Sequence, residues 1–235
     1  MGTLMGTGAL VLWLDVAPEL ERETDSWYID EHMPERIDVG GYLRARRYRA
    51  IEGGPAYLTL FEARSPSELA SDGYLRLVRR ISGQSQRIRA GFSNVVRNTF
   101  AVRRSRGRGI GPVVASLRLA PRDASGAAVA AAALDAQVPQ LLRRRGIVGV
   151  HWLQAAPAVR ERMDAVRAVG QSDAGADYAL LIEATRLADL RAVRDDAISA
   201  AALGQLGFAE QGFAIYSLLY EVAALGGETA LEDRR

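Results

Sequence analysis

Tyr28 and His32 are the residues whose types and spacing point most directly to chemistry. They lie four residues apart in a segment where Leu20, Trp27 and Tyr28 follow helical spacing, so a phenol and an imidazole would share one helix face. Such a pair can donate and accept a proton on a small carbonyl or lactone substrate. We therefore take His32 as a candidate general acid or base and Tyr28 as its partner. The alternative is that His32 only caps its helix and Tyr28 packs in the core.

The position of Pro34 predicts where the helix ends, and through this the charge of His32. Proline disfavours helical geometry at Met33, so the helix is predicted to end there and His32 to lie in its last turn. Unpaired carbonyls at a helix C-terminus, together with Asp30 and Glu31, favour the protonated imidazole. The sequence therefore predicts a charged His32.

An internal repeat indicates which elements position these residues. Three pairs of segments match: 14–18 with 117–121, 41–45 with 146–150, and 57–63 with 178–184. Each copy has the order strand, helix, strand, strand, helix, strand, which is that of a ferredoxin-like unit. The predicted fold class is α+β. Its expected parts are a first repeat at 8–102, an arginine- and glycine-rich connector at 103–111, a degenerate second repeat at 112–223 and a tail at 224–235.

A ferredoxin-like unit leaves one face of its sheet without helices. With strands about 4.8 Å apart and roughly 18 Å long, that face measures about 350 Å², or roughly 9 kcal/mol of apolar burial at about 25 cal/mol per Å². This is comparable to the stability of a whole domain, so the face must be covered. We expect the repeats to pack sheet against sheet as an intrachain barrel, in a monomer or a homodimer, with one imidazole-bearing pocket between them.

Arg46 and His151 are candidate substrate-binding residues at equivalent positions of the two repeats. Arg46 shares a strand face with Tyr42 and Arg44, whereas Ala45 lies on the more apolar face. If the apolar face packs under the helices, Arg46 and His151 point into the barrel, where the guanidinium could bind a substrate carboxylate. The alternative is a solvated, arginine-rich edge.

Trp13, Glu62 and Glu183 are further candidates on predicted strands. An aromatic wall at Trp13 would suit a planar substrate, although a tryptophan on a strand is also a common core residue. Glu62 and Glu183 recur at equivalent strand ends, which suggests structural pairing more than catalysis.

The second repeat is 16 residues longer than the first between Leu153 and Ala176. Within this insertion Val159, Met163 and Val166 have the spacing of a short amphipathic helix. Such a helix could lie across a barrel mouth as a lid or fill a gap.

Composition excludes several classes of chemistry. The sequence has no cysteine, and all 30 of its basic residues are arginine, so thiolate nucleophiles, cysteine-bound metals and lysine Schiff bases are excluded. Two histidines and no carboxylate-rich loop predict no metal site, and we expect no cofactor. The net charge of only +2, and the position of the arginine-rich stretch in the connector, argue against a nucleic-acid partner. The absence of a long apolar run or signal peptide predicts a cytoplasmic protein without membrane contact, which we expect to be bacterial.

Residues 27–36, WYIDEHMPER, followed by 41–48, GYLRARRY, resemble the EthD-like branch of the dimeric α+β barrel superfamily. The resemblance covers the first repeat well. It extends to the second repeat only because the two repeats match each other, and there Gln137 occupies the position of His32. It implies a barrel shared by two ferredoxin-like units. Members of the superfamily include cofactor-free isomerases of muconolactones, small monooxygenases and haem-binding proteins. Carried over by position, it implies a site at His32 with Trp27, Tyr28, Glu31 and Pro34 around it.

The leading hypothesis is a cofactor-independent isomerase or lyase for a small cyclic or aromatic-derived organic acid. It rests on the retention of His32 in only one of two copies. His32 and Tyr28 would be catalytic, and the substrate would contact four residues: Arg46, Trp13, Trp27 and His151. The alternatives are a non-catalytic ligand-binding protein with His32 away from an apolar cavity, a haem- or flavin-binding barrel, and a small monooxygenase.

Overall fold

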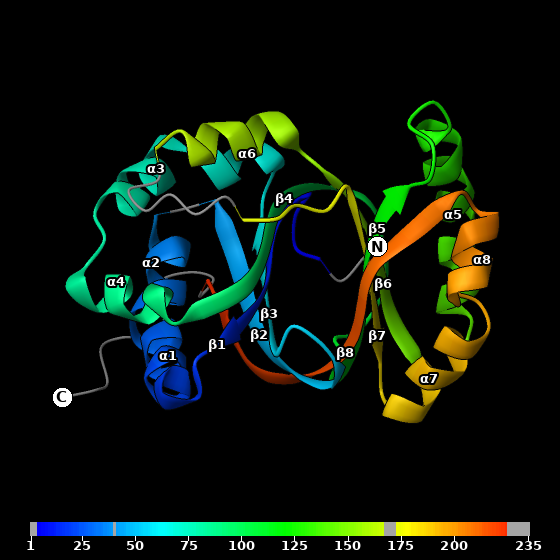
Figure 1. Cartoon of the computed structure of the whole chain (residues 1–235), viewed down its shortest axis with the longest axis horizontal. Helices are drawn as coiled ribbons and strands as arrows, with labels where there is room; N and C mark the ends of the chain where they lie inside the picture. Colours follow the sequence, from blue (N-terminus) through cyan, green and yellow to red (C-terminus); the bar gives the residue numbers. More distant parts are fainter. Residues whose placement is uncertain (1–3, 40, 167–172, 225–235) are drawn as a thin grey trace.

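The computed structural model describes residues 4–39, 41–166 and 173–224. The chain forms two lobes of helices on opposite sides of a central β-barrel (Figure 1). Both halves follow the order strand, helix, strand, strand, helix, strand, as the repeat predicts. No helix among the described residues is long and apolar enough to cross a membrane.

The first half supplies the strands and helices of one lobe. Its elements are β1 (Gly8–Val16), η1 (Pro18–Leu20), α1 (Glu21–Trp27), η2 (Tyr28–His32), α2 (Met33–Asp38), β2 (Tyr42–Gly53), β3 (Tyr57–Ala63), η3 (Pro66–Ala70), α3 (Asp72–Arg79), α4 (Gly83–Ala90) and β4 (Phe92–Gly107).

The second half repeats this order with one additional helix in the insertion. Its elements are β5 (Val113–Pro121), α5 (Ala127–Leu142), β6 (Ile147–Ala155), α6 (Pro157–Asp164), β7 (Tyr178–Ala184), α7 (Leu187–Asp195), α8 (Ala200–Gln205) and β8 (Phe208–Ala223).

The strands close into one antiparallel barrel in the order β1-β3-β2-β8-β5-β7-β6-β4. The predicted α+β class with an intrachain barrel is therefore confirmed. The two sheets also join edge to edge, through β2 with β8 and β4 with β6. The first part of β4 pairs with β1 and its last part with β6, and β8 likewise pairs with β5 and then with β2. These two strands thus belong to both sheets.

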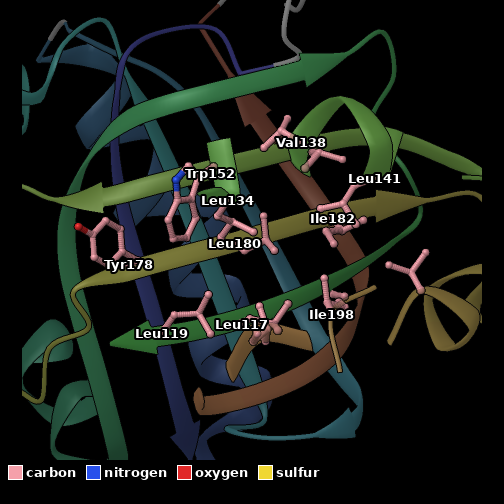
Figure 2. Packing of buried hydrophobic residues seen from close by; sticks show 14 of the residues in the cluster. Leu117, Leu119, Leu134, Val138, Leu141, Trp152, Tyr178, Leu180, Ile182 and Ile198 are labelled. Carbon is pink, nitrogen blue, oxygen red and sulfur yellow. The ribbon is translucent and has the colours of Figure 1, made fainter. Parts of the chain in front are cut away.

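Alternation along each strand separates an interior core from two outer cores. On β1, Val11 and Trp13 join the cluster inside the barrel, whereas Leu10 packs against the helices of the first repeat. The second repeat has its own outer core, in which Trp152 and Leu180 lie between the sheet and the helices (Figure 2). Every face of the barrel wall is therefore covered, which satisfies the burial requirement that the sequence imposes.

The predicted end of the first helix at Met33 is wrong. The chain stays helical from α1 through the π-helical turn η2 into α2. Pro34 lies in the first turn of α2, directly after the wider π turn, and the missing N–H of a proline is tolerated at such a position.

The segment 103–111, expected to be a connector, is largely strand. β4 continues to Gly107 and pairs with β6 along this stretch, so only 108–112 link the two halves. Arg103, near the start of the stretch, binds Asp135 and Gln154 of the second half. Arg103 and Arg104 thus form ion pairs with Asp135 across the junction of the two halves.

Candidate active site

A cavity of about 300 Å³ lies in the first repeat, between its sheet and the covering helices. Leu10, Leu12 and Leu14 of β1 form part of its sheet side, on the strand face opposite to Val11 and Trp13. Tyr28 and His32 line it from the helical layer. The imidazole-bearing cavity therefore lies on the outer side of the first-repeat sheet and not between the two sheets as predicted, although Met163 and Asp173 of the second repeat also line it.

His32 occupies the end of the π turn and is only 5% exposed. Its ring lies 4.0 Å from the Trp27 ring and 4.8 Å from the Tyr28 ring, measured between centroids. The structure gives the imidazole nitrogens no hydrogen-bond partner among the described residues, although the ring lines the cavity. A ligand in the cavity would thus meet an imidazole with free hydrogen-bonding capacity.

The prediction of a charged His32 is wrong. Burial holds the pKa of His32 well below 6.5, and the positive charges of Arg36, Arg89 and Arg47 lower this pKa further. The expected helix C-terminus is also absent, because the helix continues past His32 and Arg36 donates a hydrogen bond to the His32 carbonyl at 2.6 Å. His32 is therefore neutral at pH 7 and can accept a proton.

Tyr28 is fully buried beside His32, as the four-residue spacing predicts. Its hydroxyl has no hydrogen-bond partner among the described residues, and its ring lines the cavity. The Arg47 guanidinium lies 4.1 Å from the centroid of this ring, a cation–π distance. A buried hydroxyl without a partner costs free energy, so it marks a position where a ligand oxygen would complete the structure.

Trp27 packs against the imidazole of His32 and does not line the cavity. Its indole N–H donates to the Ser85 hydroxyl at 3.0 Å, and this hydroxyl donates to Glu31 at 3.0 Å. These bonds link α1 and η2 to α4 and fix the indole on which His32 packs. Trp27 is thus placed to position His32, and the expected contact between Trp27 and substrate stays a prediction.

Three arginines line the cavity: Arg36 from α2, Arg89 from α4 and Arg97 from β4. Arg97 forms ion pairs with Asp164 and, at 2.9 Å, with Asp173. Arg36 and Arg89 are also two of the three cations that lower the pKa of His32; the third, Arg47, does not line the cavity. Sequence reasoning missed both Arg36 and Arg89. Arg36 lies one helical turn after His32 within the motif, which was an available signal, whereas only tertiary packing brings Arg89 to the cavity.

Arg46 and His151 point into the barrel, which is one of the two arrangements that the sequence left open, and the alternative of a solvated edge is wrong. Arg46 is fully buried between two carboxylates, 3.1 Å from Glu62 and 2.8 Å from Glu183. His151 contacts Glu183 through Nε2 at 3.0 Å and the Ser105 hydroxyl through Nδ1 at 2.9 Å. Neither Arg46 nor His151 lines the cavity beside His32. The structure therefore does not bring them together with the other site candidates.

The Glu183 carboxylate is held ionised by this network. Burial by itself raises the pKa of Glu183, but the hydrogen bond with His151 and the charge of Arg46 outweigh it and lower the pKa from 4.5 to about 2. The structural pairing suggested by the recurrence of Glu62 and Glu183 is thus present. Arg46 joins these two equivalent carboxylates across the halves.

Trp13 packs inside the barrel as a core residue. Its indole N–H donates to the Ser116 hydroxyl at 2.9 Å, and its ring meets Phe100 edge to face. It lies on the opposite side of the sheet from the cavity. Of the two interpretations of Trp13, the structure favours plain core.

No protein-family model matches this sequence, and a search of curated proteins found no match. Solved structures are similar along almost the whole chain. An anthrone oxidase-like protein superposes with a TM-score of 0.63 at 16% identity, covering 95% of each chain. A candidate monooxygenase of Fusobacterium nucleatum gives 0.60 at 10% identity, covering 94% of this chain and 96% of its own. A haem-binding protein of Thermus thermophilus gives 0.54 at 11% identity, covering 92% of each chain.

The chain has the dimeric α+β barrel fold. Because the neighbours match both halves, they share the complete dimeric α+β barrel and not a single ferredoxin-like unit. At these identities the likeness concerns the fold alone. The EthD-like branch of the dimeric α+β barrel proteins stays a prediction.

Proposed function

We propose that the protein is a cofactor-independent enzyme that moves a proton on a small planar organic anion, with His32 as the base. One observation carries this proposal: a neutral imidazole faces the same cavity as a tyrosine hydroxyl that has no hydrogen-bond partner among the described residues. The alternative, a non-catalytic ligand-binding barrel, would use the same cavity without proton transfer, so the exchange experiment below separates the two roles.

The reaction begins with removal of a proton from a carbon next to a carbonyl group. His32 takes this proton, and the electron pair of the C–H bond moves onto the carbonyl oxygen to form an enolate. The Tyr28 hydroxyl donates a hydrogen bond to that oxygen, and Arg36 and Arg89 stabilise its negative charge. Return of the proton to a different carbon completes an isomerisation, and departure of a leaving group completes a lyase reaction.

The walls of the cavity define the class of substrate. Leucines of β1 and the rings of Phe61 and Tyr74 provide apolar contact, and arginines provide positive charge. A volume of about 300 Å³ is at the lower end of the range of about 300–1,000 Å³ for sites of drug-sized ligands. A compact ring system with a carboxylate or phenolate group fits these walls, as in a small cyclic or aromatic-derived organic acid.

A second candidate is cofactor-free oxygenation by dioxygen. It is favoured by the names of two structural neighbours, an anthrone oxidase-like protein and a candidate monooxygenase. The same enolate would react with dioxygen, so that a CH₂ group becomes a carbonyl while the second oxygen atom leaves as water. His32 would have the same role, and only the fate of the carbanion would differ.

Haem, which one neighbour binds according to its name, does not fit this site. An axial histidine must face a slot as broad as the porphyrin, whereas the cavity beside His32 is at the lower end for drug-sized ligands. No step of the proposed reaction therefore involves a haem.

The decisive experiment measures proton abstraction directly. Muconolactone and anthrone are incubated with the protein in D₂O under nitrogen, and loss of the acidic C–H signal is followed by NMR. Wild type should accelerate exchange of at least one of them, and His32→Gln and His32→Ala should lose about 10²- to 10⁴-fold of the rate. Gln137→Ala, at the equivalent position of the second repeat, is the matched control.

Two outcomes discriminate the alternatives. Equal exchange in wild type and both His32 variants would reject His32 as the base. Repeating the assay in air with an oxygen electrode separates the candidates, because oxygenation consumes dioxygen in proportion to product and isomerisation consumes none.

A further inference from the structure

Helix α6 belongs to the second repeat in sequence but packs on the first repeat in space. In Figure 1 it lies beside α3, in the lobe of α1 to α4, on the opposite side of the barrel from α5, α7 and α8. Val159 of α6 and Val166, two residues after its end, pack against the outer core of the first repeat, and Met163 of α6 is a member of it. The predicted amphipathic face is therefore present, but it covers the His32 cavity instead of a barrel mouth.

Main-chain hydrogen bonds attach the chain to β4 on either side of α6. Before the helix, the Ala156 N–H donates to the Thr99 carbonyl at 2.8 Å. After it, the Ala174 N–H donates to Val95 at 3.2 Å, and the Arg97 N–H donates back to Ala174 at 3.0 Å. The position of α6 over the first repeat is thus determined at both ends.

Ion pairs hold α6 on this surface as well. Arg97 of β4 pairs with Asp164 at the end of α6 and with Asp173 beyond it. Arg162 of α6 pairs with Asp72 at the start of α3, at 2.8 Å. The buried Arg97 therefore attaches the end of α6 to β4, whereas the exposed pair between Arg162 and Asp72 contributes little.

Met163 is the residue of α6 that reaches the cavity. It is 2% exposed and lines the same space as Tyr28 and His32. Its flexible, unbranched side chain fills room that a larger ring system would need. The following inference rests on the proposed function. We propose that Met163 limits the size of the aromatic anion that can bind in the cavity of the first repeat, so that a residue of the second repeat determines substrate selectivity.

The test compares binding of two rigid anions of different length, 2-naphthoate and anthracene-2-carboxylate, by isothermal titration calorimetry. Wild type should prefer naphthoate. Truncation by Met163→Ala opens the wall by about the volume of one fused ring, and should shift the affinity ratio toward the anthracene anion by about tenfold or more. Met33→Ala is the matched control, because Met33 is equally buried in the same apolar cluster but does not line the cavity.

An unchanged ratio in Met163→Ala, or an equal shift in Met33→Ala, would overturn the role of Met163. If wild type binds neither anion, the proposed binding site itself is wrong and the selectivity role fails with it. If the ratio shifts while no substrate exchanges its proton, the catalytic proposal fails and the selectivity role stands. Met163→Val, a smaller truncation with the same expected direction, replaces the alanine variant if that variant does not fold.

Discussion

Arg46 is a buried cation that joins the two halves of the barrel, and replacing it with methionine tests whether its role is structural. The guanidinium is fully buried and contacts Glu62 and Glu183, each 1% exposed. Methionine preserves much of the apolar stem but leaves both carboxylates without this partner. Loss of one member of a buried ion pair costs about 3–5 kcal/mol when the remaining charge is uncompensated; because Glu62 keeps Arg44 and Glu183 keeps His151, we expect the lower end, about 3 kcal/mol.

The pKa of Glu183 gives a second measure of the same effect. A decrease from 4.5 to about 2 corresponds to roughly 3 kcal/mol of stabilisation, which His151 and Arg46 provide together. Because the folded-state pKa is lowered, this contribution is complete above pH 4.5 and is lost as the pH falls toward 2. The stability difference between wild type and Arg46→Met should therefore shrink over that interval.

Urea unfolding at pH 7 provides the measurement. For a slope of about 2–3 kcal/mol per molar, the midpoint of Arg46→Met should fall by about 1–2 M. Arg49→Met is the control on the same strand, since its pair with Glu21 is exposed and should contribute no more than about 1 kcal/mol. Equal midpoints for the two variants would refute the structural role of Arg46.

Three further predictions concern the cavity. Tyr28→Phe removes a hydroxyl that has no partner among the described residues, so stability should change by less than about 1 kcal/mol while proton exchange in D₂O slows by about 100-fold; an unchanged rate would exclude Tyr28 from the reaction. Because the pKa of His32 is lowered on folding, the unfolded chain takes up a proton below about pH 6.5 that the folded protein does not. Wild type should therefore lose more stability than His32→Gln between about pH 7.5 and 5.5, as measured by urea midpoints. The purified protein should show no absorption band beyond the aromatic region, and a haem band would contradict the size argument.

Much of the fold could be predicted from the sequence because the repeat is visible in it. Matching segments gave the order of elements in both halves, and the uncovered sheet faces required the halves to meet. Local features were harder to predict. A register shift between Tyr42 and Arg44 places Tyr42 among the outer-core residues although strict alternation groups it with Arg46. The extension of β4 to Gly107 was not predicted, because the arginines in this stretch resemble those of a solvated linker.

The candidate site was predicted only in part. The four-residue spacing placed Tyr28 and His32 together correctly, since both periodicity and contact are local properties of a helix. Their surroundings depend on long-range packing, which brings Arg89 from α4 and Met163 from the other half. The predicted charge of His32 was also wrong. Burial and the charges of three arginines lower its pKa, and these effects outweigh the local helix dipole; the arginines are Arg36, Arg47 and Arg89.

β4 and β8 each begin in one sheet and end in the other. Separating the two halves would break the backbone hydrogen bonds of β4 with β6 and of β8 with β2, in addition to side-chain contacts. Despite its doubled sequence, the molecule should therefore melt in a single calorimetric transition, and either half expressed alone should expose unpaired strand edges and self-associate.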